Sequence, residues 1–460
     1  MYQVNFQHPL HIYFVGIGGI SMSGLAEILA DAGFTVSGSD KKKSPLTSRL
    51  ESKGIHINYG QREENITPDI ELAIFTSAIH ADNPEYIAVQ KAGIPSLTRA
   101  QLLGQIMKNY ATPIAISGTH GKTTATSMIS QILLEAHADP TVSIGGMLSS
   151  IGGNIRVGNS DLFVTEACEY TNSFLSFYPK IAVILNIEAD HLDFFKDLAD
   201  IRSSFRRFAQ LLPADGTLII NGEIPDYREI TEGLPCRVIT FGHDSSFDYW
   251  PQQIRYNELA CPSFVLHGPN DSRSSIQLGV PGDHNILNAM AALALADLLA
   301  IDRKTAATAL TTFTGTGRRF EYKGKIGGVT IIDDYAHHPT EITATLKAAA
   351  GYPHKTLWCV FQPHTYSRTK SFLGEFAQAL CLADKIVLAD IYSADRETDN
   401  LGISSQTLQQ EIEKLGHECY YFPTFDEIEN FLLENCINGD LLITMGAGDV
   451  LKIGENLLGI

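Results

Sequence analysis

Residues 116–124, which read Ile-Ser-Gly-Thr-His-Gly-Lys-Thr-Thr, combine a glycine-rich turn with one lysine and neighbouring hydroxyls. An apolar run precedes them and a helical pattern follows, so we expect the turn to join a strand to a helix. In a phosphate-binding loop of this type, Lys122 would reach the β- and γ-phosphates and Thr123 would place its hydroxyl on Mg²⁺. Ile116 stands where the usual pattern begins with glycine, so the loop is shortened. The segment predicts a nucleoside-triphosphate site made by Gly118, Thr119, His120, Gly121, Lys122, Thr123 and Thr124.

Acidic and imidazole side chains follow the next two predicted strands. Glu166 ends the apolar run 162–166, and Glu169 comes three residues later. His191 lies in the segment NIEADHLD, just after the apolar run IAVILNI. The carboxyl ends of parallel strands meet at one edge of a sheet, where α/β proteins bind ligands. Mg²⁺ uses few protein ligands beside phosphate oxygens, so we predict a metal site at Thr123, Glu166 and His191.

Three later segments carry further polar groups. His284 opens an alanine-rich helix and is either a cap or a ligand, while the amides of Asn285 and Asn288, one turn apart, suit an adenine edge. Arg319, in the segment GTGRRFE, suits a phosphoryl group in transfer because a cation neutralises the charge of the transition state. The segment DDYAHHPT, residues 333–340, also permits a metal site. We disfavour that site because adjacent loop histidines point apart.

A first glycine-rich turn occupies residues 16–24 and follows an apolar run at 11–15. Its backbone N–H groups suit a pyrophosphate. Ser21 stands at the third glycine position of the dinucleotide fingerprint, and Asp40 ends the next strand, where a ribose-binding acid would lie. From these residues alone, three interpretations stay open: a nicotinamide or flavin fold, the pyrophosphate of another nucleotide, or structural glycines.

Short apolar runs alternate with helical patterns along the whole chain, which is typical of parallel α/β layers. We expect strands at residues 94–96 and 181–187, among others, and an antiparallel flank within residues 234–280. The fold class we predict is α/β with three successive α/β domains. These are a Rossmann-like domain at residues 1–107, a central P-loop domain with a parallel sheet at 108–313, and a Rossmann-like C-terminal domain at 314–460.

The composition argues against nucleic-acid-binding and membrane proteins. The 460 residues include 34 Lys+Arg and 52 Asp+Glu, a net charge of −18, which argues against nucleic-acid and membrane-surface partners. The longest apolar stretch, residues 289–300, is shorter than the roughly 20 residues that cross a bilayer. The seven cysteines are scattered outside C-x-x-C pairs, as in reduced cytosolic proteins. We expect a soluble, cytoplasmic protein.

The motifs GIGGISMSG, GTHGKTT, NIEADH, GDHNILNA, GRRFE, DDYAHHPTE, FQPHTYSRT and MGAGD follow one another from end to end of the chain. In this order they resemble the motifs of the Mur ligases, the ATP-dependent enzymes that build the peptide stem of peptidoglycan. The resemblance is greatest to the member that ligates L-alanine to the lactyl carboxylate of UDP-N-acetylmuramate through an acyl phosphate. It implies ATP and Mg²⁺ as cofactors and a monomer or homodimer.

The resemblance also implies roles for single residues. In the first domain, the pyrophosphate of the UDP group would be held by Gly18, Gly19, Ser21 and Ser23, with Asp40 near the uridine. In the central domain, Lys122, Glu166 and His191 would serve the phosphates and the metal, and the adenine would lie against His284, Asn285 and Asn288. From the third domain, Arg319 and Asp334 would close over the nucleotide, while His337 and Arg368 would orient the amino acid.

The chain departs from the family pattern in places. Thr365 stands where several members have arginine, and Arg206 stands where others carry a carbamylated lysine, which we therefore do not expect. Glu169 is a candidate ligand for a second metal ion. Three other functions remain as alternatives: a recycling ligase that adds a ready-made tripeptide, a non-catalytic UDP-sugar sensor, and a nicotinamide oxidoreductase. The P-loop disfavours the last of these.

Overall fold

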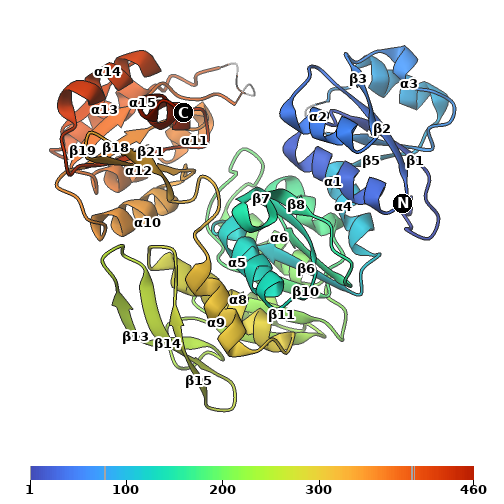
Figure 1. Cartoon of the computed structure of the whole chain (residues 1–460), viewed down its shortest axis with the longest axis horizontal. Coiled ribbons are helices and arrows are strands. Elements are labelled where there is room, and N and C mark those ends of the chain that lie inside the picture. Colours follow the sequence, from blue (N-terminus) through green and yellow to red (C-terminus); the bar gives the residue numbers. More distant parts are fainter. Residues whose placement is uncertain (1, 77–78, 395–396, 398) are drawn as a thin grey trace.

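The computed structural model describes residues 2–76, 79–394, 397 and 399–460. The protein is α/β, and its parallel-dominated sheets form three bodies that succeed one another along the chain, with the central body between the other two (Figure 1). Each main sheet falls within one of the segments 1–107, 108–313 and 314–460. We therefore retain these three segments as the proposed domains. Within the described ranges, every helix is too short or too polar to span a bilayer.

The first sheet is entirely parallel, with the strand order β3-β2-β1-β4-β5. The strand predicted at 94–96 is instead β5, Ser96–Thr98, because Gly93 ends the preceding helix in the left-handed conformation, with φ of 67°, and Pro95 follows. The other elements are β1 (His11–Val15), β2 (Thr35–Asp40), β3 (His56–Tyr59), β4 (Leu72–Phe75), α1 (Ile20–Asp31), α2 (Pro45–Ser52), η1 (Glu63–Asn65), α3 (Pro84–Ala92) and α4 (Arg99–Met107).

The central sheet has the order β12-β11-β10-β6-β9-β7-β8, in which only β8 runs antiparallel to its neighbour. The expected antiparallel flank is confirmed as the sheet β13-β14-β15. The strands are β6 (Thr112–Ser117), β7 (Thr141–Leu148), β8 (Gly153–Arg156), β9 (Leu162–Glu166), β10 (Ile181–Ile184), β11 (Thr217–Asn221), β12 (Arg237–Phe241), β13 (Trp250–Tyr256), β14 (Pro262–Gly268) and β15 (Ser272–Gln277). The helices are α5 (Lys122–Glu135), η2 (Ser149–Ile151), η3 (Tyr170–Ser176), α6 (Leu198–Ala209), α7 (Tyr227–Thr231), α8 (His284–Leu298) and α9 (Arg303–Thr312).

Strand β10 is shorter than predicted, since it ends at Ile184 rather than at residue 187. All four of its residues are buried, as expected for a central parallel strand. Beyond it, the Asn186 side chain accepts from the His120 backbone N–H at 2.7 Å and donates to the His120 carbonyl at 3.0 Å. The prediction for the end of this strand was wrong because the residues after Ile184 bind the glycine-rich turn at residues 118–121, the phosphate-loop turn, instead of extending the sheet.

The C-terminal sheet has the order β16-β17-β21-β18-β19-β20, with β16 as its antiparallel edge. Strand β16 begins within the segment GRRFE, so this segment leads directly into the third sheet. The elements are β16 (Glu321–Ile326), β17 (Val329–Asp334), α10 (Pro339–Ala350), β18 (Leu357–Phe361), α11 (Tyr366–Ser371), α12 (Leu373–Leu380), β19 (Lys385–Leu388), α13 (Ser405–Lys414), β20 (Cys419–Tyr421), α14 (Phe425–Asn435), β21 (Leu441–Met445) and α15 (Leu451–Leu458).

A glycine fixes how the first body packs on the second. Gly104 lies in α4, and a Cβ built on it would come 1.9 Å from the carbonyl oxygen of Ser176, at the end of η3. Only a residue without a side chain therefore allows the helix to approach that backbone so closely.

We expect Gly104→Ala to lower the free energy of unfolding by about 1–3 kcal/mol, because the methyl group must push the two backbones apart. Urea unfolding followed by circular dichroism measures this loss. The matched control is Gly374→Ala in α12, where an added Cβ meets no heavy atom of the described chain within 4 Å. That variant should be unchanged or slightly more stable. Equal shifts in both variants would contradict the packing argument.

Candidate active site

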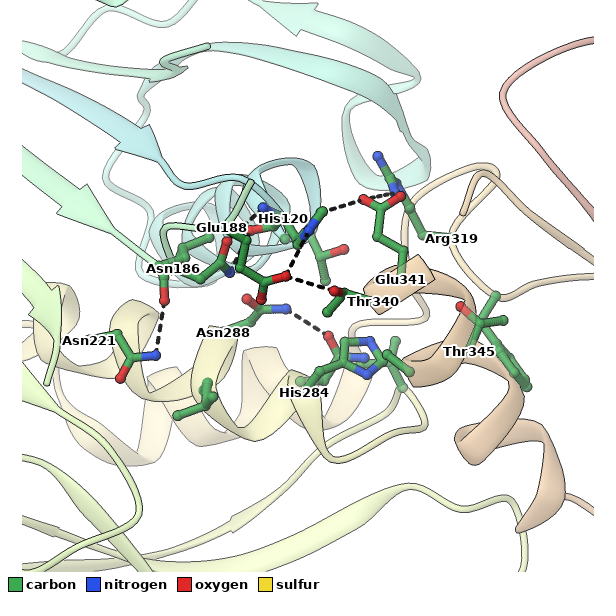
Figure 2. Close-up of a pocket in the computed structure, with 18 of the residues that line it drawn as sticks. His120, Asn186, Glu188, Asn221, His284, Asn288, Arg319, Thr340, Glu341 and Thr345 are labelled. Atoms are coloured by element: carbon green, nitrogen blue, oxygen red, sulfur yellow. Dashed lines mark hydrogen bonds and ion pairs between the residues drawn. The ribbon is translucent and has the colours of Figure 1, made fainter. Parts of the chain in front are cut away.

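A cavity of about 410 Å³ lies where the central and C-terminal bodies meet. Figure 2 shows its walls: the phosphate-loop turn, the segment after β10, the start of α8 and the start of α10. It brings together groups from residues 120–345 of the chain. The predicted site residues that line it are His120, Gly121, Thr124, His284, Asn285, Asn288, Arg319 and Asp334.

The turn before α5 has the features of an anion site. Gly121, with φ of 81°, precedes Lys122 and has no side chain to cap the first N–H groups of the helix. The positive end of the helix dipole therefore faces outward from the turn. The Lys122 ammonium lies 3.0 Å from a Glu169 carboxylate oxygen and donates to the Thr119 carbonyl at 3.0 Å. Burial opposes its charge, but Glu169 keeps the pKa of Lys122 above its usual range, so a cation is held at the turn.

Two of the three predicted metal ligands are in contact. The Thr123 hydroxyl donates to Glu166 at 3.1 Å, and the other Glu166 oxygen accepts from the Gly145 N–H at 2.6 Å. His191 instead lies beside Glu169, at 3.9 Å, and stacks on Tyr170. Burial lowers the pKa of His191, which favours the neutral imidazole. A hydroxyl and a carboxylate are hard oxygen donors, so Thr123 and Glu166 fit Mg²⁺.

The start of α8 forms one wall of the cavity. The Asn285 amide donates to the Pro281 carbonyl at 2.7 Å, and the Asn288 amide donates to Asn285 at 3.0 Å. A Cβ on Gly121 would lie 2.7 Å from the Asn288 side-chain oxygen, so this wall packs directly against the phosphate-loop turn. Burial lowers the pKa of His284 to about 4, so the imidazole in the wall is neutral.

The third body contributes the opposite wall. Asp334 accepts from the N–H groups of Phe320 and Ala336, both at 2.7 Å, and burial raises its pKa to about 6 despite the nearby Arg319. The Arg319 guanidinium lies over the Tyr335 ring, 5.1 Å from its centre. Asp334 thus fixes the loop that carries Arg319 to the cavity.

Two further carboxylates line the cavity, one from each body, and the sequence interpretation did not single them out. Glu341 lies 3.2 Å from Nδ1 of His120, and Glu188 lies 3.5 Å from Nε2 (Figure 2). Although burial opposes it, these carboxylates raise the pKa of His120 to about 9. Both acids stand inside the motifs DDYAHHPTE and NIEADH. Their positions in these motifs were visible in the sequence, but their pairing across the cavity was not.

His337 and Arg368 lie in the third body next to this wall. His337 donates from Nδ1 to the Tyr335 carbonyl at 2.9 Å, and burial lowers its pKa to about 4. Arg368 donates to Asp190 of the central body at 2.8 Å and lies 2.9 Å from a His364 ring nitrogen. Arg368 therefore forms a buried ion pair between the two bodies. The expectation that His337 and His338 point apart is confirmed, since His338 bonds the Ala189 carbonyl instead.

The first glycine-rich turn lies in the first body, apart from the cavity-lining residues. The Gly18 N–H donates to Asp40 at 2.8 Å. The Ser21 hydroxyl accepts from Arg99 at 3.1 Å, and Arg99 was not predicted. The Ser23 hydroxyl is buried and donates to the Ile20 carbonyl within α1, while Gly19 precedes that helix.

Family models match three successive parts of the chain. Residues 11–111 match the Mur ligase family catalytic domain, residues 116–296 the Mur ligase middle domain, and residues 318–448 the Mur ligase glutamate ligase domain. A UDP-N-acetylmuramate–L-alanine ligase of Agathobacter rectalis is 59% identical over 458 residues, covering 100% of both chains. The chain belongs to the Mur ligase family. A ligase of the same name from Lachnospira eligens is 57% identical over 459 residues, again covering 100% of both.

Solved Mur ligase structures have the same architecture. The UDP-N-acetylmuramate–alanine ligase of Thermotoga maritima is 29% identical, with a TM-score of 0.81 and 98% of each chain covered. A murein peptide ligase of Psychrobacter arcticus is 24% identical, with a TM-score of 0.71 and 98% of each chain covered. Because the identity to the Psychrobacter arcticus protein is low, this similarity supports the fold alone.

We expect His337 to stay neutral, as the Nδ1–H tautomer, from about pH 5 to pH 8. Its pKa is lowered from the usual 6.5 to about 4, so the stabilisation from the neutral ring persists above 6.5 and is lost as the pH falls through 4. Nitrogen-15 NMR of histidine-labelled protein reports the tautomer. The His337→Asn variant assigns the signal. A His337 signal that titrates near pH 6.5 would show that the ring is not held in this way.

Proposed function

We propose that this Mur ligase joins L-alanine to the lactyl carboxylate of UDP-N-acetylmuramate at the expense of ATP, in peptidoglycan precursor synthesis. The observation that carries the proposal is the end-to-end likeness, at 59% identity, to a ligase of that name. The cavity between the central and C-terminal bodies supports it, because a nucleotide there would be reached by residues of both.

We assign the nucleotide to this cavity and its phosphates to the turn before α5. The N–H groups of the turn and the Lys122 ammonium would hold the phosphates, and Lys122 would exchange Glu169 for phosphate oxygens. The neutral wall formed by His284, Asn285 and Asn288 would take the adenine. Arg319 and Asp334 would cover the nucleotide from the third body.

Thr123 and Glu166 would hold Mg²⁺, with His191 supporting the site through Glu169. Bound MgATP would supply its γ-phosphoryl group to the lactyl carboxylate, with ADP leaving; the amine of alanine would then displace phosphate from the acyl phosphate and lose a proton to give the amide. The partly buried cations Lys122 and Arg319 would offset the charge that develops in the phosphoryl transfer. The tightly packed walls would keep water from the activated carboxylate.

The amino acid would lie next to His337. Its neutral Nε2 is available to accept a proton or a hydrogen bond from an amine, because Nδ1 carries the ring hydrogen. Arg368 is the candidate partner of the amino-acid carboxylate, which would have to share it with Asp190. The pyrophosphate of the UDP group would lie at the first glycine-rich turn, on Gly18, Gly19, Ser21 and Ser23, with Asp40 near the uridine.

We expect Lys122→Ala to reduce ATP-dependent turnover by about 100- to 1,000-fold, since it removes the cation held at the phosphate turn. Binding of UDP-N-acetylmuramate, measured by calorimetry, should change by less than about twofold, because that site lies in the first body. Lys347→Ala, an exposed lysine on α10, is the matched control and should retain activity. Unaltered turnover in Lys122→Ala would refute the assignment of the phosphate turn.

We expect phosphate release from ATP, Mg²⁺ and UDP-N-acetylmuramate to depend on L-alanine. The comparison amine is the tripeptide that begins with L-Ala-D-Glu. Since both amines present the same L-alanyl terminus, the assay isolates the effect of the second and third residues of the tripeptide. Preference for the tripeptide would reassign the protein to recycling. Absence of release with both amines would indicate a UDP-sugar sensor.

A further inference from the structure

His120, Glu188 and His338 converge at the boundary between the central and C-terminal bodies. One ligand-competent atom from each lies within 4.8 Å of the others. His120 lies in the glycine-rich turn before α5, and Glu188 lies in the segment after β10. His338 is the N-cap residue of α10. These residues are separate from Thr123 and Glu166, the pair to which we assign the magnesium ion.

His120 has the arrangement expected of a metal-binding imidazole. Its Nδ1 is held by Glu341 at 3.2 Å, which orients the ring. Its Nε2 is buried and faces the Glu188 carboxylate at 3.5 Å, an ion pair that, among the described residues, is its nearest polar contact and is too long or bent for a hydrogen bond. A cation bound at Nε2 would displace the proton that this ion pair holds. A carboxylate that bonds one ring nitrogen and leaves the other for the metal is the usual outer partner of a ligating histidine.

The other two ligands are also fixed in place. Glu188 accepts from the Thr340 hydroxyl at 2.7 Å (Figure 2). The His338 ring lies 4.7 Å from the His120 ring, centre to centre. It bonds the Ala189 carbonyl at 3.1 Å and accepts from the Thr340 N–H at 3.3 Å. A cation would replace one of these two hydrogen bonds of His338.

We propose that this cluster binds a divalent transition-metal cation of the zinc class. Two imidazoles and one carboxylate form a three-ligand protein set that leaves a fourth tetrahedral position open. Imidazole nitrogens favour such cations over Mg²⁺, which selects oxygen donors. The two carboxylates nearby, Glu188 and Glu341, supply the negative charge that a dication requires. His120 and Glu188 also line the cavity, so the fourth ligand comes from that side.

The ligands belong to two bodies, which gives the cation a mechanical effect. His120 and Glu188 belong to the central body and His338 to the third, so the cation clamps the two together. The same clamp fixes the phosphate turn, and it therefore slows the ligase. This inhibitory consequence rests on the proposed function, whereas metal binding rests on the geometry alone.

The binding test uses metal-free full-length protein with Co²⁺ as a spectroscopic probe and Zn²⁺ as competitor. We expect visible absorption of four-coordinate Co²⁺ at one site per chain, lost on adding Zn²⁺. His338→Gln should weaken Zn²⁺ binding by at least about 100-fold, and Glu341→Gln by about 10-fold. His56→Gln, an exposed histidine on β3, is the matched control and should bind as the unmodified protein does. Glu188→Gln is a second ligand variant, used if His338→Gln fails to fold.

Equal Zn²⁺ affinity in the folded ligand variants and the unmodified protein would overturn the site. The clamp has its own test, the ratio of phosphate release with and without Zn²⁺ at fixed MgATP. We expect strong inhibition of the unmodified enzyme and of His56→Gln, and relief in His338→Gln. Binding without inhibition overturns the clamp. If no amine supports phosphate release at all, the proposed function fails while the Co²⁺ result still decides the metal site.

Discussion

The ion pair between the partly buried Lys122 and the buried Glu169 is the interaction on which the site depends. A helix N-terminus and an ammonium together create a strongly positive turn, and such a turn is stable in a protein interior only with a compensating charge. Glu169 supplies that charge from the loop after β9, and it also contacts His191. An anionic ligand at the turn competes for the same ammonium. Ligand binding is therefore coupled to the loop after β9, which carries Glu169 and follows Glu166 directly.

The rigidity of the turn comes from its neighbours in the sheet. Asn186, just beyond β10, binds both backbone groups of His120, and the Thr119 N–H bonds the Asn186 carbonyl. The segment after β10 thus holds the turn through hydrogen bonds from both the side-chain amide and the main chain of Asn186. This is why β10 ends early, and why the turn can present N–H groups outward without collapsing on itself.

Ion pairs join the third body to the central body. Glu341 of the third body pairs with His120 of the central body, and Arg368 pairs with Asp190. Buried ion pairs between bodies are costly to break singly but depend on accurate geometry. Such contacts form only when the bodies are correctly aligned, so they suit an active site that is assembled from two domains.

The local pattern of the sequence determined the α/β class, the two glycine-rich turns and the order of the motifs, because strand, turn and helix signals are short-range. It also determined the residue types of the phosphate turn and of Glu166. The tertiary structure alone decided the partners. His120 and Glu341 are 221 residues apart, and Arg368 and Asp190 are 178 apart. Such pairings follow from the packing of one body on another, and no periodicity within either segment encodes that packing.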